Sequence, residues 1–384
     1  MRPRGRSRRS QQGAGSTSSP ALTHQDEKST VKHLNEINAQ MASRAMEAAQ
    51  LTRPPHEWDR FHAVGVKIRT DRLFGVLVDV HGDVVVDAAG HTEDQGLVRE
   101  LVATDVDSVV GGVADLVTGL LDQHSELERP VGLGVELSGQ VDGRSGIVRR
   151  SHRMGWYQPV PLARLIEDGT GFPTMVEHDV KALALGEQMF GLGQGRRSFA
   201  VVTAGLGVGA GVVINHDLWR GRTGTAGELG HIVVELDGTP CSCGNRGCLE
   251  TVAGSEGIVR AIQETGRQDA ADIEAASRLA RQGDETVRRV FQRAGDILGR
   301  GLSWLANLVN PELIIVRADP ALLASGVYEL SARQAYQLYS FYDIASDCEL
   351  LIQERVNGLG ARSAGSMVFR LLPDRLAELG EPRR

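Results

Sequence analysis

Aromatic side chains are scarce in this sequence, and it lacks both long apolar runs and a strong excess of one charge. Phe, Trp and Tyr make up 4% of the 384 residues, whereas 46 glycines predict many tight turns and close backbone contacts. The longest apolar run, residues 199–214, is broken by glycines and is too short to cross a bilayer. No apolar segment of the signal-peptide kind follows the first arginines. With a net charge of −7, the sequence indicates a cytoplasmic protein long enough for two domains, with no membrane partner.

Cysteine is scarce as well, and its distribution points to metal binding. Three of the four cysteines, Cys241, Cys243 and Cys248, lie within eight residues, and Cys348 is far from them. With His231 they offer one imidazole and three thiolates, a complete tetrahedral ligand set for a structural Zn²⁺. A Cys-x-Cys pair is too short for an unstrained disulfide, and a reducing cytosol would not keep one closed. The alternative is a glycine-rich turn that carries unliganded thiols.

Two carboxylates flank this cluster. Glu228 precedes His231 by three residues, and Glu250 follows Cys248 by two. The zinc ligand set is complete without them, and carboxylates held beside a metal-closed loop can accept hydrogen bonds from a polyol. We therefore expect Glu228 and Glu250 to line a sugar-binding site.

The same segment carries a family resemblance. Glu-Leu-Gly-His at 228–231, followed by Cys-x-Cys-Gly-x-x-Gly-Cys-Leu-Glu at 241–250, resembles the signature of the ROK family of bacterial sugar repressors, open reading frames and sugar kinases. The resemblance extends over about residues 61–370. It implies an α/β chain with a two-lobed, actin-like and hexokinase-like fold of duplicated ribonuclease H-like units, assembled as a homodimer or homotetramer. It also implies that His231 binds zinc through one ring nitrogen and a sugar hydroxyl through the other.

The first 60 residues lie outside the main body. Residues 1–30 are rich in Arg, Ser, Gln and Gly, so we predict a disordered basic tail, which is favoured over nucleic-acid contact. Residues 31–60 contain apolar side chains at helical spacing until Pro54 and Pro55 stop the helix. This segment resembles the first helix of the winged helix-turn-helix of ROK repressors, reduced to a remnant without a recognition helix. A dimerisation or docking helix is the alternative.

The main body is predicted from changes in hydrophobic period. Two triplets of strand-like segments are each followed by long helices, which indicates two α/β units with a cleft between them. We expect a first lobe over residues 61–178, a second lobe with the zinc site over 179–356, and a C-terminal helix within 357–384 that returns to the first lobe. The expected strands are 63–70, 73–80 and 83–90 in the first triplet and 198–203, 209–214 and 218–221 in the second. The expected helices include one with Val98, Leu101 and Val102 on its buried side, one over 284–309, and one over 361–372.

A candidate catalytic residue begins a predicted helix. Asp179, in the segment VEHDVKALALGE, resembles the aspartate that binds sugar and accepts its proton in ROK kinases. The alternative is an ordinary helix cap. The neighbouring sugar contacts are altered, because His178 and Arg153 stand where asparagines are usual in the family.

The nucleotide side departs further from the kinase pattern. Kinases of the family carry Asp-x-Gly-Gly-Thr after the first strand, whereas this chain has Lys67 and Arg69 there. Leu206 stands in the second glycine-rich loop where a threonine hydroxyl is typical, and Arg317 replaces a glycine at the adenosine end. These changes remove the carboxylate and bare backbone that would hold Mg²⁺ and phosphates, so ATP and Mg²⁺ are not expected as cofactors.

The function predicted from these residues is that of a zinc-stabilised, sugar-sensing ROK regulator without kinase activity. Its sugar-binding residues would be Asp179, Glu228, His231 and Glu250, and its partners a small sugar and, less readily, DNA. The first alternative is an ATP-dependent kinase of a hexose or amino sugar, with Asp179 as the catalytic base. The second alternative is a protein-interaction scaffold without catalysis.

Overall fold

The computed structural model describes residues 58–85, 96–356 and 358–371 of the chain. The predicted basic tail and nearly all of the predicted helix-turn-helix remnant lie outside these residues. In the described part, no helix combines the length and the apolarity needed to span a bilayer.

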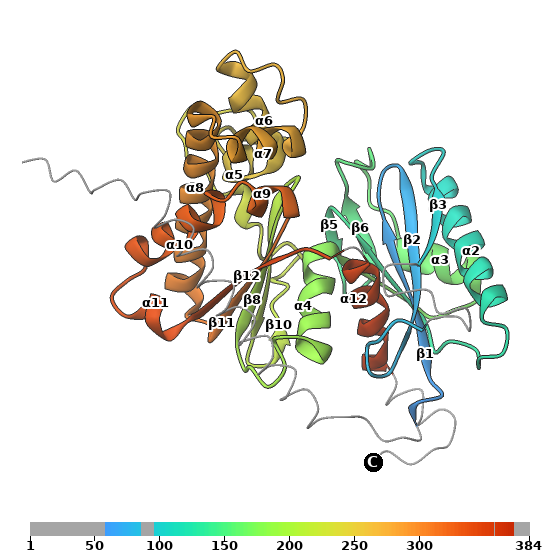
Figure 1. Cartoon of the computed structure of the whole chain (residues 1–384). Helices are drawn as coiled ribbons and strands as arrows, with labels where there is room; N and C mark the ends of the chain where they lie inside the picture. Colours follow the sequence, from blue (N-terminus) through green and yellow to red (C-terminus); the bar gives the residue numbers. More distant parts are fainter. Residues whose placement is uncertain (1–57, 86–95, 357, 372–384) are drawn as a thin grey trace, which may run out of the picture.

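Two five-stranded sheets form the centres of two lobes (Figure 1). The first sheet has the order β3-β2-β1-β4-β7 and the second the order β10-β9-β8-β11-β12. In each, the first three strands of the chain are antiparallel and the last two pair in parallel, so both sheets share one topology. The strands are β1 His62–Ile68, β2 Arg72–Asp79, β3 Leu97–Glu100, β4 Leu133–Leu137, β7 Thr174–His178, β8 Phe199–Ala204, β9 Val208–Ile214, β10 Asp217–Leu218, β11 Leu313–Ala318 and β12 Glu349–Glu354. This duplication confirms the two-lobed, actin-like and hexokinase-like fold.

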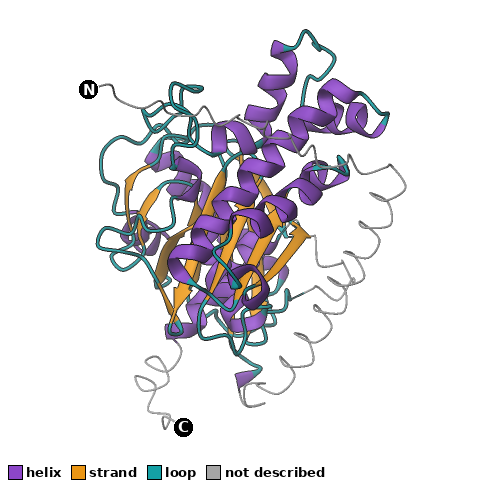
Figure 2. Cartoon of the chain, turned by 90° about the vertical axis from the view of Figure 1, so that its left-hand side faces the viewer, coloured by secondary structure: helices purple, strands orange, loops and turns teal. Residues whose placement is uncertain are grey.

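Helices cover the outer faces of both sheets and fill the space between them. Helices α4 and α12 lie between the sheets (Figure 1), and Figure 2 looks onto the helices that cover the second sheet. A small hairpin, β5 Gln140–Asp142 and β6 Ile147–Arg150, extends the first lobe. The helices are α2 Val106–Gln123, α3 Leu162–Thr170, α4 Asp179–Phe190, α5 Glu250–Ala253, α6 Ser255–Glu264, α7 Ile273–Arg281, α8 Glu285–Val309, α9 Pro320–Ala324, α10 Tyr328–Tyr339, α11 Ile344–Asp347 and α12 Leu359–Met367, with 3-10 turns η3 Leu229–His231 and η4 Val368–Leu371.

Local sequence signals explain the longest helix. The carboxylate of Asp284 accepts a hydrogen bond from the backbone N–H of Val287 and so caps the start of α8. Asn310, in the left-handed conformation at φ 47°, ends it. The face between these ends, which includes Phe291, Leu298 and Leu302, is buried in the core of the second lobe. The predicted helix over 284–309 therefore agrees with α8 to within one residue.

The C-terminal helix α12 packs on the first sheet. Helix α12 packs on β1, β2 and β4 and against α4, which itself packs on β8 and β9 of the second sheet. Glycines make this contact close, because a Cβ on Gly65 would lie 1.9 Å from the carbonyl oxygen of Ala361 and one on Gly134 would lie 1.8 Å from that of Ala364. These contacts support a first lobe completed by residues after 357; the lobe boundaries themselves stay predictions.

One part of the first lobe differs from the prediction. Val98, placed on the buried side of a helix, lies in strand β3 opposite Phe74 of β2, and Val102 lies fully exposed after it. The helix begins only at Val106, because the side chain of Asp105 caps the N–H of Ser108. Most of the predicted third strand, 83–90, falls on residues 86–95, which are not described. Apolar side chains recur from strand β3 through the turn into helix α2. The sequence pattern therefore did not show where the strand ends or where the helix begins.

Replacing Gly134 by valine tests the close contact between α12 and the first sheet. We expect Gly134→Val to lower the free energy of unfolding by about 3 kcal/mol or more, because the backbone of α12 must move away. Gly111→Ala in α2 is the control, since a Cβ there meets nothing within 4 Å. That change should stabilise the protein by up to about 1 kcal/mol. Urea unfolding monitored by circular dichroism measures both values, and a neutral Gly134→Val would contradict this packing.

Candidate functional site

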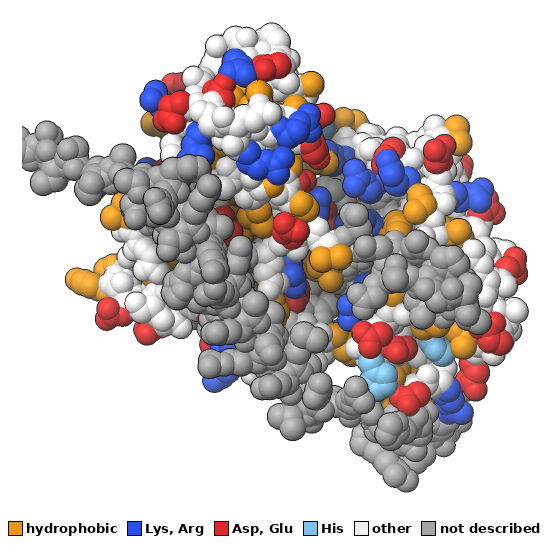
Figure 3. Space-filling model, in the orientation of Figure 1, with side chains coloured by type: hydrophobic (Ala, Val, Ile, Leu, Met, Phe, Trp, Pro, Cys, Tyr) orange, Lys and Arg blue, Asp and Glu red, His pale blue; other side chains and the backbone are white. Residues whose placement is uncertain are grey.

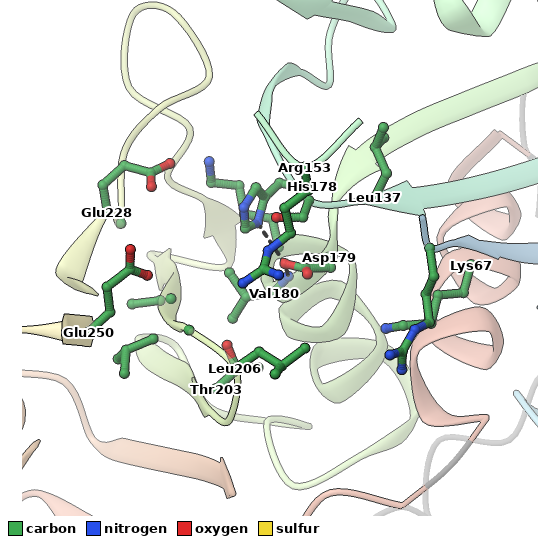
Figure 4. A pocket seen from close by; sticks show the side chains of 18 of the residues that line it. Lys67, Leu137, Arg153, His178, Asp179, Val180, Thr203, Leu206, Glu228 and Glu250 are labelled. Atoms are coloured by element: carbon green, nitrogen blue, oxygen red, sulfur yellow. Dashed lines mark hydrogen bonds and ion pairs between the residues drawn. The ribbon is translucent and has the colours of Figure 1, made fainter. Parts of the chain in front are cut away.

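A pocket between the lobes collects the predicted site residues. Its walls come from the ends of β1, β4 and β7, the start of α4, the turn between β8 and β9, and the segments that carry Glu228, His231 and Glu250. Figure 4 shows Glu228 and Glu250 on one side, Lys67 on the opposite side, and Asp179 between them. Figure 3 shows Lys and Arg side chains on both sides of the upper part of the gap between the lobes.

The four predicted metal ligands meet beside this pocket. One ligand atom from each of His231, Cys241, Cys243 and Cys248 lies within 4.8 Å of the others. The loop that brings them together turns tightly at Gly247, whose φ is 69° and whose Cβ, if present, would lie 1.8 Å from the carbonyl oxygen of Glu235. Glycine is required at such a position.

The spacing of these atoms fits a tetrahedral ion. Cys241 Sγ lies 3.5 Å from His231 Nδ1, and Cys243 Sγ lies 3.7 Å from Cys248 Sγ. A Zn²⁺ ion with bonds of about 2.3 Å to sulfur and about 2.0 Å to nitrogen places its ligand atoms about 3.5 Å (S to N) and about 3.8 Å (S to S) apart. The three thiols and the Nδ1 of His231 are therefore the residues that would hold zinc, and zinc would supply a rigid crosslink for the loop.

The imidazole of His231 connects this cluster to the pocket. Its Nδ1 faces Cys241 and lies 3.5 Å from Glu250 Oε1, while its Nε2 lies 3.9 Å from Glu228 Oε2. Glu250 Oε1 also accepts a hydrogen bond from Cys241 Sγ at 3.2 Å. Because His231, Glu228 and Glu250 all line the pocket, ligation of Nδ1 would leave Nε2 as a hydrogen-bond donor there.

Asp179 stands at the centre of the pocket, as the first residue of α4. Its Oδ1 accepts a hydrogen bond from the N–H of Val180 at 2.7 Å and lies 3.0 Å from Nδ1 of His178. Burial acts to raise the pKa of Asp179, but the interaction with His178, the charge of Lys67 and the backbone hydrogen bond from Val180 together hold this pKa below its usual value. The side chain, 38% exposed, is thus an ionised acceptor open to a ligand hydroxyl.

The opposite wall holds an ion pair at the end of β1. Lys67 Nζ donates a 2.6 Å hydrogen bond to Glu136 Oε1 of the neighbouring strand β4. Glu136 is 0% exposed, and Gly360 of α12 packs directly on the pair, since a Cβ there would lie 2.0 Å from Glu136 Oε1. Burial acts to lower the pKa of Lys67, but the Glu136 carboxylate outweighs it, so this pKa is raised and Lys67 stays charged.

Two residues that depart from the kinase pattern on the nucleotide side lie in different places. Leu206 does line the pocket, with 46% of its surface exposed. Arg317, which replaces a glycine at the adenosine end, has a guanidinium that donates to the Glu187 carboxylate of α4 and to Gln353 Oε1. Arg317 is not among the residues that line the pocket.

Three charged residues of the site were missed from the sequence. Glu136 interrupts the otherwise apolar strand β4, which is a signal, because a lone charge in a fully buried strand needs a partner. Lys181 lies buried on α4 and donates to the carbonyl oxygen of Gly224. Arg355 lines the pocket from the segment between β12 and α12, where no pattern in the sequence pointed to it.

Removing a predicted ligand tests the metal site. We expect about one zinc per chain by mass spectrometry of the purified protein, and much less in Cys243→Ser. Because zinc binding contributes to folding, with about 10–16 kcal/mol measured for structural sites in peptides, the same variant should lose at least about 3 kcal/mol of stability. The control is Cys348→Ser, a buried cysteine outside the cluster, which should keep its zinc. Equal zinc contents in the two variants would contradict the ligand set.

A double-mutant cycle tests the ion pair. Lys67→Met should cost about 3 kcal/mol of unfolding free energy, because Glu136 is left buried without its partner and burial already raises the pKa of its carboxyl group. Lys67→Met/Glu136→Leu should recover most of that loss, since an apolar pair can replace a buried ion pair. Arg69→Met is the control: Arg69 is 48% exposed and its bridge to Asp71 spans 3.5 Å, so a cost below about 1 kcal/mol is expected. Additive single changes would mean that Lys67 and Glu136 do not interact.

Comparison with known proteins finds both kinases and repressors. The chain is 34% identical over 256 residues to a glucokinase of Thermotoga maritima, covering 60% of this chain and 80% of that protein. It is 28% identical over 290 residues to the xylose repressor of Bacillus subtilis, covering 74% and 72%. A solved ROK family transcriptional regulator, described as a homologue of the E. coli MLC protein, shares the fold with a TM-score of 0.73 at 24% identity, covering 89% of each chain. The model of the ROK family matches residues 77–364, so this chain belongs to the ROK family.

Proposed function

We propose that this protein is a sugar-sensing regulator of the ROK family, held together at its sugar-binding wall by zinc and without kinase activity. The observation that carries the proposal is the Lys67–Glu136 ion pair at the end of β1. A kinase needs a carboxylate or bare backbone near this position for Mg²⁺ and the phosphates of ATP. Here an ammonium group, fixed by a buried carboxylate, repels Mg²⁺.

Sugar binding would take place at the wall of the pocket that carries the carboxylates and the zinc ligand His231. Asp179, Glu228 and Glu250 present carboxylate acceptors to one pocket, and His231 presents a ring nitrogen whose orientation zinc would fix. Carboxylates that converge on one pocket suit the several hydroxyls of a sugar. A bound sugar would touch both lobes and so favour their closed arrangement.

The regulatory output would come from that closure. A ligand between the lobes would change the position of α12, which packs on the first sheet and against α4. Contact with DNA, as in repressors, would depend on residues before 61, most of which the structure does not describe. A homodimer or homotetramer would present two or more such surfaces.

The second candidate function is an ATP-dependent sugar kinase. Asp179, ionised at the start of α4 and open to the pocket, favours it, because a base in this place could accept the proton of a sugar hydroxyl. The 34% identity to a glucokinase also supports it. The kinase candidate is disfavoured because Lys67, Arg69 and Leu206 stand where a kinase has phosphate-binding groups. Each missing group would cost about a few kcal/mol of transition-state stabilisation, and together they would remove many powers of ten in rate.

Two measurements on one preparation separate these functions. With ATP, Mg²⁺ and a panel of hexoses, amino sugars and xylose, we expect no ADP above the rate without sugar. The Thermotoga maritima glucokinase serves as the positive control. In thermal shift with the same panel, at least one sugar should raise the melting midpoint, since a ligand at about 100 times its Kd adds about 2.7 kcal/mol.

Two single-residue variants then test whether the sugar binds at the carboxylates of the pocket. Glu228→Gln should weaken that sugar about tenfold or more, because a charge-assisted hydrogen bond to a hydroxyl is lost. Glu274→Gln, exposed on α7, is the matched control and should leave the Kd unchanged. Sustained, sugar-dependent ADP formation would reject the regulator in favour of the kinase. No shift with any sugar would reject sugar sensing.

A further inference from the structure

Two carboxylates of the pocket, Asp179 and Glu228, are carried by separate parts of the fold. Asp179 begins α4 directly after β7 of the first sheet, whereas Glu228 ends a loop over residues 219–227 that leaves β10 of the second sheet. Both side chains line the pocket (Figure 4). Their relative position therefore depends on what joins the 219–227 loop to the junction of β7 and α4.

The carboxylate of Glu177 in β7 makes this join. Its Oε1 accepts a hydrogen bond from the backbone N–H of His178 at 3.0 Å, and its Oε2 accepts one from Arg220 Nε at 2.7 Å. The Glu177 side chain is 2% exposed and that of Arg220 is 16% exposed, so water and salt screen this charge-assisted bond only weakly. Neither residue lines the pocket. One buried carboxylate therefore holds both the residue before Asp179 and the start of the 219–227 loop.

Close backbone contacts fix the tip of the same loop. Gly224, at φ 83°, lies so near the hairpin strand β5 that a Cβ on it would stand 2.2 Å from the carbonyl oxygen of Val141. The carbonyl oxygen of Gly224 accepts a hydrogen bond from Lys181 of α4. A Cβ on Gly143, directly after β5, would lie 2.1 Å from Glu177 Oε2. The hairpin, α4 and the loop therefore pack closely around this carboxylate.

The buried Lys181 connects the join to the pocket electrostatically. Burial lowers the pKa of Lys181, while the carboxylates of Glu177 and Glu228 act to raise it. Arg220 acts to lower the same pKa, and it keeps the charge of Glu177 paired. Because Lys181 also lines the pocket, the Glu177–Arg220 pair influences the electrostatic surroundings of Glu228.

We propose that Glu177 and Arg220 are positioning residues of the sugar site, which hold Asp179 and Glu228 at the spacing that a sugar needs. The inference rests on the proposed sugar-binding function and adds two residues that act without touching the ligand. A sugar that contacts both carboxylates spans the same two elements that the pair joins. The pair lowers the cost of binding, because the loop that carries Glu228 is ordered before the sugar arrives.

Calorimetric titration of the full, zinc-loaded chain tests the positioning role. The probes are glucose, mannose, glucosamine and xylose, and the tightest binder is carried into the variants. Arg220→Gln should weaken that sugar about tenfold, because Glu228 is no longer held in place. Its zinc content by mass spectrometry should stay unchanged, since the loop carries no metal ligand. Made in a Glu228→Gln background, Arg220→Gln should change the Kd by less than about twofold, since its effect acts through Glu228.

The matched control is Arg317→Gln. It breaks a similarly buried ion pair, in which Arg317 is 12% and Glu187 of α4 is 3% exposed, and neither partner lines the pocket. Its loss of stability in urea should resemble that of Arg220→Gln, because each leaves a buried carboxylate unpaired. Its Kd for the sugar should stay within about twofold of the wild-type value.

Two further variants keep the test decisive if Arg220→Gln does not fold. Glu177→Gln has nearly the same shape, but a carboxamide has one acceptor oxygen and cannot serve both Arg220 and the N–H of His178. It should therefore weaken the sugar as well, and again only when Glu228 is present. Arg220→Lys keeps the cation and should bind within about threefold of the wild type.

The outcomes separate this inference from the proposed function. If the wild-type chain binds none of the four probes, sugar sensing fails and the inference fails with it. If it binds one, and the affinity survives both Arg220→Gln and Glu177→Gln, the inference is overturned while sugar sensing stands. An equal loss in the Glu228→Gln background, or in Arg317→Gln, would show a purely structural ion pair and would overturn it in the same way.

Discussion

One fully buried carboxylate sets the charge of one wall of the cleft. Glu136 lies inside the first lobe at 0% exposure, and an ionised group there is tolerated only with a cation beside it. Lys67 of the neighbouring strand supplies that cation at 2.6 Å. Gly360 of the returning helix α12 leaves just enough room for the pair. The wall of the cleft that would face a nucleotide is therefore cationic, and the helix that joins the lobes rests on it.

The facing wall is organised by ligation instead of ion pairing. His231 Nδ1 and three thiols converge with the spacing of a tetrahedral ion, and the Glu250 carboxylate contacts both His231 and Cys241. Side chains that would hold the metal thus also orient the hydroxyl-binding groups. One wall is fixed by the Lys67–Glu136 ion pair and the other by the cluster of possible metal ligands. A ligand between them meets carboxylate acceptors at one end and cationic donors at the other.

This chain of the ROK family is similar to both glucokinases and repressors, so its function has to be argued from its own cleft. In this chain Asp179 lines the pocket where the proposal places the sugar, and Lys67, Arg69 and Leu206 line it where a kinase would hold phosphates. These replacements are the basis of the proposal that the site recognises a sugar without transferring a phosphoryl group. Under that proposal, closure around the ligand would be transmitted through α12.

Several features of the protein were determined by the sequence on its own. The second strand triplet, helix α8 with its Asp284 cap, and the cysteine cluster were predicted because each depends on residues close together in the chain. Asp179 was correctly placed at the start of a helix for the same reason. Only the tertiary structure decided that Lys67 pairs with Glu136, 69 residues away, that Arg317 turns to Glu187, and that Arg355 enters the cleft. Hydrophobic period records which face of an element is buried, whereas the partner of a buried charge depends on which distant elements the packing brings beside it.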